Sequence, residues 1–189
     1  VDEKGTVLWG DQLMILFSRA VLAENPGAAI VGEVKCSKTL YDDIAARGGR
    51  GIMWKAGHSL IKAKMKEEGA LLAGEMSGHI FFAHRWFGFD DGIYSSGRLI
   101  ELVSRTDRPV STLLADVPRT FSTPEIRYDC PEEMKFELVR LAQEWFAARH
   151  EAVTVDGVRV IFPDGWGLVR ASNTQPLLVL RFEARTPER

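Results

Sequence analysis

The sequence lacks several features that would place it in a specialised class of protein. Only two of its 189 residues are cysteine, Cys36 and Cys130, and neither lies in a CxxC or histidine-rich pattern, so we expect reduced thiols and no zinc site. The chain does not begin with a basic segment followed by an apolar run, and no apolar run is long enough to span a membrane. The formal net charge is only −2, without a basic stripe. We therefore expect a cytoplasmic protein with neither a membrane nor a nucleic acid as partner.

Strand-like and helix-like segments alternate over the first two thirds of the chain. Apolar runs predict strands at 6–9 (after a turn at 2–5), 29–34, 51–54, 71–73 and 80–82, and helical patterns occupy 13–22, 37–47, 59–68 and 91–104. Asp11 and Ser37 are expected to cap their helices. The apolar face expected for the last helix consists of Ile93, Leu99, Ile100 and Val103. This alternation predicts an α/β layer structure with a largely parallel sheet.

The composition of the chain changes near residues 118–124, where Ser, Thr and Pro cluster as is typical of a linker. Beyond it, the patterns predict a helix at 131–149 and strands at 125–128, 152–155, 158–162, 167–169 and 177–182. Asp156-Gly157, between two of these strands, is a strong hairpin signal. One helix with a small antiparallel sheet predicts an α+β domain.

A polar loop is predicted between the last two strands, with the sequence RASNTQP at 170–176. The guanidinium of Arg170 suits bidentate pairing with a phosphate group, and a turn of backbone N–H groups forms an anion nest. Ser172, Asn173 and Thr174 add two hydroxyls and an amide. The chain has no Walker pattern, so a nucleotide is not implied. The alternative is an ordinary polar hairpin loop.

A second polar cluster is GEMSGH at 74–79. In an extended segment, Glu75, Ser77 and His79 would point to one side. A carboxylate, a hydroxyl and an imidazole together suit the hydroxyl groups of a sugar. A solvated turn is the alternative.

Two further side chains stand where ligands often bind. His58 is expected at the start of a helix, where free N–H groups favour an anion. Lys35 follows a predicted strand, at the edge where open α/β sheets place their ligands. Asp90 and Asp91 precede a helix and are expected to cap it rather than to bind a metal, because no third oxygen ligand lies nearby in sequence.

These motifs, in this order, resemble the α-D-phosphohexomutase superfamily. GEMSGH and RASNTQP are similar to two of its loops, and GEVKCSKTL at 32–40, WKAGHSLIKAKM at 54–65 and RWFGFDDGIYS at 85–95 resemble its bacterial-type phosphomannomutase/phosphoglucomutase branch. The resemblance covers essentially the whole chain. Met76 and Asn173 depart from the corresponding loops of phosphoglucosamine mutases, and Met76 departs from that of eukaryotic-type phosphoglucomutases.

Enzymes of that family have four domains around a deep cleft, so the resemblance implies that this chain is the C-terminal part of one. Residues 1–24 would be the end of domain 2, and residues 25–122 an α/β/α domain 3 with a mixed sheet. Residues 123–189 would be a small α+β domain 4, with helices on an antiparallel sheet. The family's phosphoserine and its DGDGDR-like magnesium loop have no counterpart in the sequence. We therefore expect the chain alone to be inactive and domains 1 and 2 of the same protein to be its partners.

The resemblance also implies a role for each residue singled out above. Glu75 and Ser77 match the loop that holds ring hydroxyls, with His79 beside them. Lys35 and His58 match supporting catalytic residues of the cleft, and Lys35 is a candidate for proton transfer. The residues that match the loop for the phosphate group that is not transferred are Arg170, Ser172, Asn173 and Thr174. No residue of this chain is expected to bind a metal.

The implied reaction interconverts hexose 1-phosphate and hexose 6-phosphate, with mannose or glucose as the sugar. It proceeds through an enzyme phosphoserine and a 1,6-bisphosphate intermediate, with Mg²⁺ as cofactor and glucose or mannose 1,6-bisphosphate as activator. The alternative is a stand-alone, non-catalytic module that binds sugar phosphates.

Overall fold

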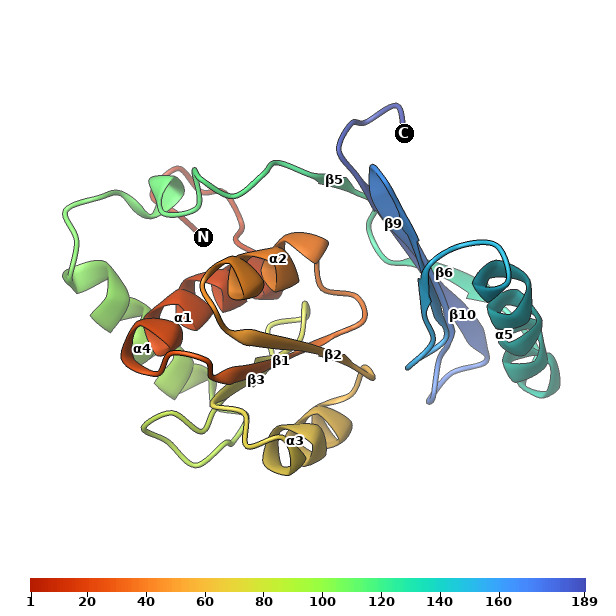
Figure 1. Cartoon of the computed structure of the whole chain (residues 1–189), viewed down its shortest axis with the longest axis horizontal. Coiled ribbons are helices and arrows are strands. Elements are labelled where there is room, and N and C mark those ends of the chain that lie inside the picture. The colour runs from red at the N-terminus through yellow and green to blue at the C-terminus, as the bar shows by residue number, and fades with distance from the viewer. The chain divides into compact units, whose positions relative to one another are not determined.

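The computed structural model describes all 189 residues and divides them into two units, Val1–Pro118 and Arg119–Arg189 (Figure 1). The boundary falls at the start of the predicted linker. None of the α-helices has the length and apolar character that crossing a membrane requires.

The first unit alternates strands and helices around a four-stranded sheet. Its elements are α1 (Gly10–Glu24), β1 (Ala29–Glu33), α2 (Lys38–Ala46), β2 (Arg50–Trp54), α3 (His58–Glu67), β3 (Leu72–Gly74), β4 (Ile80–Phe82), α4 (Gly92–Ser104) and a short 3-10 helix (Val110–Thr112). The strand order is β2-β1-β3-β4; β1 is parallel to β2 and β3, whereas β4 is antiparallel to β3. The sheet is therefore mixed, as the fold class predicted from the sequence requires.

Helices cover both faces of this sheet. Met14 of α1 and Leu40 of α2 are buried in one apolar core, against which Leu99 of α4 also packs. Ile61 and Met65 of α3 are buried in a second core on the opposite face (Figure 1). This is the predicted α/β/α architecture. Helix α1, which the resemblance assigns to the end of a preceding domain, packs here as part of the first unit.

Local signals placed most elements within one or two residues, but the predicted start of the chain is wrong. Ser37 caps α2 as predicted, with its side chain accepting a hydrogen bond from the N–H of Thr39. Residues 6–9 pair with no strand, and α1 begins at Gly10 with Trp9 as its N-cap. Asp11 is not a cap: it lies inside the helix, is buried, and accepts a hydrogen bond from the N–H of Ser37. A long-range contact therefore uses the carboxylate that local reasoning assigned to the helix start.

The predicted apolar face of α4 is wrong in part. Leu99 packs against the core, but Ile93 and Ile100 are 90% and 69% exposed, and Arg98 is buried on this helix. The guanidinium of Arg98 lies 4.6 Å from the ring centre of Phe82 and donates a hydrogen bond to the carbonyl of His84. An arginine stem with its planar head on an aromatic ring can fill a core position if its N–H groups find acceptors. The spacing of apolar residues along the helix does not show that an arginine will occupy a core position.

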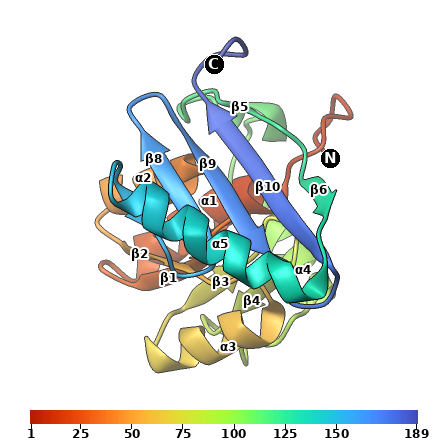
Figure 2. The same ribbon diagram turned by 90° about the vertical axis from the view of Figure 1, so that its right-hand side faces the viewer.

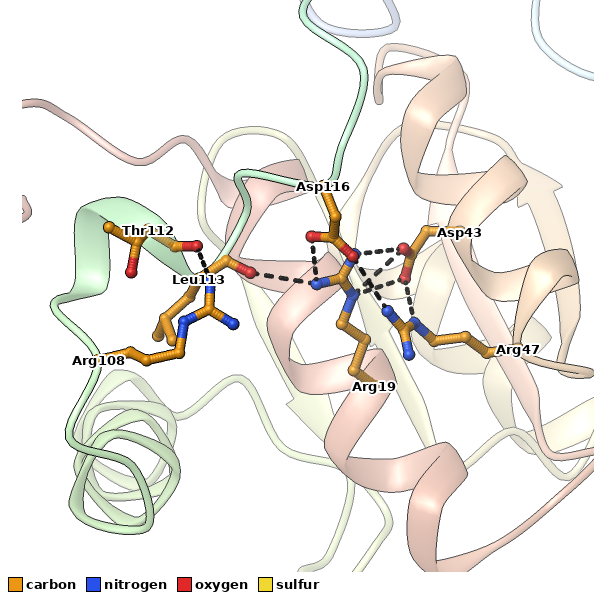
Figure 3. Close-up of polar contacts among 7 residues, drawn as sticks. All are labelled: Arg19, Asp43, Arg47, Arg108, Thr112, Leu113 and Asp116. Carbon is orange, nitrogen blue, oxygen red and sulfur yellow. Dashed lines mark hydrogen bonds and ion pairs between the residues drawn. The ribbon is translucent and has the colours of Figure 1, made fainter.

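A network of ion pairs around Arg19 joins the last segment of the first unit to its helices (Figure 3). Arg19 of α1 lies between Asp43 of α2 and Asp116, with nitrogen–oxygen distances of 2.6 and 2.9 Å, and also donates to the carbonyl of Leu113 at 3.1 Å. Arg47 adds contacts of 3.2 Å to Asp43 and 3.4 Å to Asp116. These hydrogen bonds raise the pKa of Arg19 and lower that of Asp116. The network ties the last segment of the unit to two helices.

The second unit is an antiparallel sheet with one helix on it (Figure 2). Its elements are β5 (Phe121–Ser122), β6 (Ile126–Asp129), α5 (Glu132–Ala147), β7 (Ala152–Val153), β8 (Val158–Phe162), β9 (Gly165–Ala171) and β10 (Leu177–Ala184). The strand order is β5-β10-β9-β8-β7, and β6 also pairs with β10. The predicted turn at Asp156-Gly157 joins β7 to β8, and Gly157 has a φ of 73°. The strands β9 and β10 are longer than predicted, and β5 was not predicted.

Candidate functional site

Three of the predicted site residues follow the carboxyl ends of the parallel strands of the first unit. Lys35 comes two residues after β1, His58 starts the helix after β2, and Glu75 directly follows β3. Parallel strands end at one edge of a sheet, which is where open α/β sheets bind ligands. The topology therefore brings these residues to a common edge.

The 74–79 loop is held in place by backbone hydrogen bonds. The N–H of Glu75 donates to the carbonyl of His79 at 2.9 Å, and the N–H of Gly78 donates to the carbonyl of Glu75 at 3.0 Å. The carbonyl of Met76 accepts from the N–H of Gly10 at 3.1 Å, which attaches the loop to the start of α1. The loop is therefore a fixed turn rather than a freely solvated one.

The carboxylate of Glu75 is buried but only partly satisfied. Glu75 is 6% exposed, and its Oε2 accepts a hydrogen bond from the Ser77 hydroxyl at 3.3 Å. Oε1 has no hydrogen-bond partner in the chain. A buried carboxylate oxygen without a donor costs free energy, so a ligand hydroxyl would be a favourable partner.

The two histidines of this edge lie close together. The ring centres of His58 and His79 are 6.3 Å apart, and both side chains are exposed. Nδ1 of His79 lies 2.6 Å from Oδ2 of Asp90. Asp91 alone caps α4, accepting from the N–H of Tyr94 at 2.8 Å. Asp90 is thus not the helix cap that we predicted, because its carboxylate contacts His79.

A buried acid that the sequence reasoning missed connects Lys35 to the 74–79 loop. Glu33, the last residue of β1, is fully buried, and its Oε1 accepts from the N–H of Met76 at 3.0 Å. The same oxygen lies 3.6 Å from the ammonium nitrogen of Lys35. The signal for Glu33 was a charged residue within an otherwise apolar strand, beside a lysine.

The second unit carries the remaining predicted site residues on or beside the β9–β10 loop. Arg170 is 7% exposed, and its Nε donates to Oδ2 of Asp156 at 3.0 Å. Its two terminal NH₂ groups make no hydrogen bond within the chain. A carboxylate therefore orients the guanidinium and leaves donors available for an anion. Sequence reasoning took Asp156 only as a turn residue.

The side chain of Ser172 stabilises the loop through hydrogen bonds with its backbone. Its Oγ accepts hydrogen bonds from the N–H groups of Thr174 and Gln175, at 3.3 and 3.2 Å, which leaves its own O–H to donate. Asn173 and Thr174 are exposed at the tip of the loop. Arginine and hydroxyl donors thus converge on a short loop between two strands, a set that suits a phosphate group.

A magnesium site does not fit the residues of this chain. No group of three or more His, Cys, Asp or Glu side chains is arranged to hold a metal ion. Asp90 is engaged with His79, and Asp91 caps α4. Mg²⁺ is usually bound through one or two carboxylates together with waters and substrate phosphates, and these two carboxylates are already engaged.

Both units match family models. Residues 9–121 match the model for phosphoglucomutase/phosphomannomutase, alpha/beta/alpha domain III, and residues 125–189 match that for the phosphoglucomutase/phosphomannomutase C-terminal domain.

Curated relatives carry the corresponding names. The chain is 53% identical over 191 aligned positions to a phosphomannomutase/phosphoglucomutase of Pseudomonas aeruginosa, which covers 100% of the chain and 41% of that protein. It is 49% identical to a phosphoglucomutase of Neisseria gonorrhoeae, and the match covers 98% of the chain and 41% of that protein. The chain thus spans about two fifths of the length of these relatives.

A solved structure agrees. The chain matches the crystal structure of a phosphoglucomutase/phosphomannomutase family protein from Burkholderia thailandensis with a TM-score of 0.86 and 45% identity, over 97% of the chain and 39% of that protein. The two domain models together cover nearly all residues of the chain. They and the relatives at this identity agree on one family. The chain belongs to the phosphoglucomutase/phosphomannomutase family.

Proposed function

We propose that the full-length protein containing this chain interconverts hexose 1-phosphate and hexose 6-phosphate, with mannose or glucose as the sugar. The proposal rests on the family membership and on two sets of polar groups, one in each unit. In the first unit, Glu75 and Ser77, with His79 beside them, would hold ring hydroxyls. In the second unit, Arg170 and the loop that follows it would hold the phosphate group that is not transferred.

The observation that carries the sugar assignment is the buried carboxylate of Glu75. Its Oε1 lacks a donor within the chain, while Oε2 is held by Ser77. A sugar hydroxyl would supply the missing donor, and a charge-assisted hydrogen bond of this kind contributes about 1.5–3 kcal/mol. This makes Glu75 a better partner for a polyol than for an anion, which its charge would repel.

The residues of this chain would act by positioning rather than by bond making. Phosphoryl transfer depends mainly on alignment and on electrostatic stabilisation, and a misplaced substrate loses much of the rate. We propose that the nucleophilic phosphoserine and the magnesium ligands belong to other parts of the protein. His58 and Lys35 would support the reaction at the sheet edge, with Lys35 as the group that moves a proton to or from a sugar hydroxyl.

Titration of the ¹⁵N-labelled chain tests the binding roles. Glucose 6-phosphate and mannose 6-phosphate should shift the amide resonances of residues 75–79 and 170–175, whereas inorganic phosphate should shift only those of 170–175. Glu75→Gln should weaken binding of both sugar phosphates about tenfold, because one charged hydrogen bond is lost, and should leave inorganic phosphate binding unchanged.

Glu67→Gln is the matched control, because Glu67 is exposed near the end of α3 and away from the 74–79 loop. Equal sugar phosphate affinity in Glu75→Gln and the parent chain would contradict the role of Glu75. Mutase assays belong to the full-length protein. If that protein binds both sugar phosphates but converts neither, the function is that of a binding module instead.

A further inference from the structure

A buried lysine lies directly beneath the β9–β10 loop. Lys135, in the first turn of α5, has a side chain only 1% exposed. Its ammonium nitrogen donates to the carbonyl of Gln175 at 3.0 Å and to Oε2 of Glu132 at 2.7 Å. It also lies 4.9 Å from the ring centre of Phe136. One cation thus joins the start of the helix to the loop that carries the proposed phosphate site.

This position is unfavourable for a lysine by itself. Taking an ammonium group out of water costs several kcal/mol unless partners replace the water. The first turn of a helix is also the positive end of its dipole, which disfavours a cation. Glu132 offsets the charge only in part, because its carboxylate is 63% exposed. The contact that distinguishes Lys135 from an ordinary helix-surface lysine is the one to the loop.

The contact between Lys135 and the carbonyl of Gln175 helps to fix the carboxyl-terminal end of the β9–β10 loop. The carbonyl of Gln175 accepts from Lys135 and from the N–H of Leu177 at 2.8 Å, so both of its lone pairs are used. The carbonyl of Pro176 accepts from the N–H of Cys130 at 2.9 Å. At the other end, Ser172 holds the N–H of Gln175. The peptide units around Gln175 are therefore fixed from both sides.

We propose that Lys135 is a positioning residue for phosphate binding. By holding the carbonyl of Gln175, it keeps the 172–176 loop in the conformation in which the Ser172 hydroxyl points away from its two N–H donors and toward a phosphate group held by Arg170. Its buried positive charge also favours an anion at the loop. The inference rests on the phosphate role proposed for this loop and assigns the part of the fold that shapes it.

Two substitutions separate the parts of this role. Lys135→Met keeps an unbranched apolar chain and removes both the charge and the hydrogen bond. Lys135→Gln removes the charge but keeps an N–H donor. Arg140→Met is the matched control on the same helix, because Arg140 also pairs with glutamates three and four residues away, Glu137 and Glu144, but is exposed.

The probe is inorganic phosphate, titrated into the ¹⁵N-labelled 189-residue chain. We expect Lys135→Met to raise the dissociation constant about tenfold and to speed hydrogen exchange of the Thr174 and Gln175 amides. Lys135→Gln should fall between Lys135→Met and the parent chain, and Arg140→Met should match the parent. A merely structural lysine would lower the melting temperature without changing the affinity of the molecules that remain folded.

The outcomes distinguish the two proposals. If phosphate shifts no amide of residues 170–175 in the parent chain, the phosphate role of the loop fails, and the inference fails with it. If the parent binds phosphate and a folded Lys135→Met binds it equally well, only the role of Lys135 is overturned. Should both variants fail to fold, the parent's own ¹⁵Nζ resonance of Lys135 decides. It must be protected from exchange and must shift when phosphate is added, and an unchanged resonance would contradict the proposal.

Discussion

Gly10 shows how closely the backbone of α1 approaches the 74–79 loop. A Cβ atom at this position would lie 2.3 Å from the carbonyl oxygen of Glu75 and 2.7 Å from that of Met76. Both are backbone atoms in a loop fixed by its own hydrogen bonds, so a side-chain rotation cannot relieve the clash. Position 10 therefore requires glycine for reasons of space.

We predict that Gly10→Ala displaces the 74–79 loop. It should lower the free energy of unfolding by about 1–3 kcal/mol, as overpacking does, and weaken glucose 6-phosphate binding while inorganic phosphate binding in the second unit stays unchanged. Chemical denaturation and NMR titration measure the two effects. The control is Gly97→Ala, because Gly97 lies inside α4 with open space around its Cβ position. This variant should gain about 0.5–1 kcal/mol, and a destabilised Gly97→Ala would show that the comparison is unsound.

The residues that the sequence singled out and those it did not differ in a physical way. Glu75 and Arg170 stand in short motifs with local signals, glycines and adjoining strands, so their places next to strands followed from the sequence. Glu33, Asp156 and Lys135 make contacts with residues distant in sequence, at separations of 43, 14 and 40 positions. Such contacts depend on which strands become neighbours, and no local pattern encodes that.

The same distinction holds for helices and strands. The cap of α2 and the hairpin turn before β8 were predicted, because capping and turn chemistry act within a few residues. The buried face of α4 was not, since Arg98 occupies a core position that its residue type does not suggest. The lengths of β9 and β10 were underestimated, because their ends are set by pairing with one another along Gly165–Ala184.

A buried histidine, His84, connects α1 to α4. Nε2 of His84 lies 3.1 Å from a carboxylate oxygen of Glu24, and its Nδ1 lies 3.2 Å from a guanidinium nitrogen of Arg98. Burial lowers the pKa of His84, and the positive charges of Arg98 and Arg85 lower it further, against the opposing effect of Glu24. The neutral imidazole suits the site, with Nε2–H donating to Glu24 and Nδ1 accepting from Arg98.

This predicts a loss of stability in mildly acidic solution. Because the pKa of His84 is lower in the folded state, the unfolded chain binds its proton first as the pH falls below about 6.5. The free energy of unfolding should therefore decrease from pH 7.5 to 5.5, above the range in which most carboxylates titrate. Urea denaturation should show a flatter pH dependence for His84→Gln than for the parent. His150→Gln is the control at an exposed site; equal slopes for all three proteins would contradict the role of His84.

The connection between the two units is short because both of its ends are anchored. Asp116 is held by Arg19, two residues before the unit boundary at Pro118 (Figure 3). On the other side, Phe121 pairs with Ala184. Val117 also packs against the apolar core of the first unit, so residues 118–120 are the segment left between the anchors. The sequence suggested a linker here from its Pro, Ser and Thr content, but not the contacts of Arg19 and Val117 that hold the segment before it.

We predict that Arg19→Met releases the end of the first unit. It removes paired hydrogen bonds to two carboxylates and one to the carbonyl of Leu113, and it leaves Arg47 as the remaining cation near Asp43. The free energy of unfolding should fall by about 1–3 kcal/mol, the range for charged hydrogen bonds in a partly buried site. Hydrogen exchange should become faster at the amides of residues 113–117, while the buried middle of α1 keeps its protection. The linker then lengthens at its amino-terminal end.

The control is Arg50→Met, which removes the ion pair with the Glu68 carboxylate and a hydrogen bond to the Glu68 carbonyl from an arginine that is 55% exposed. Exposed pairs contribute little, so stability should change by less than about 1 kcal/mol and exchange at 113–117 should not change. Unaltered exchange at 113–117 in a folded Arg19→Met chain would show that the segment is held by its apolar contacts instead.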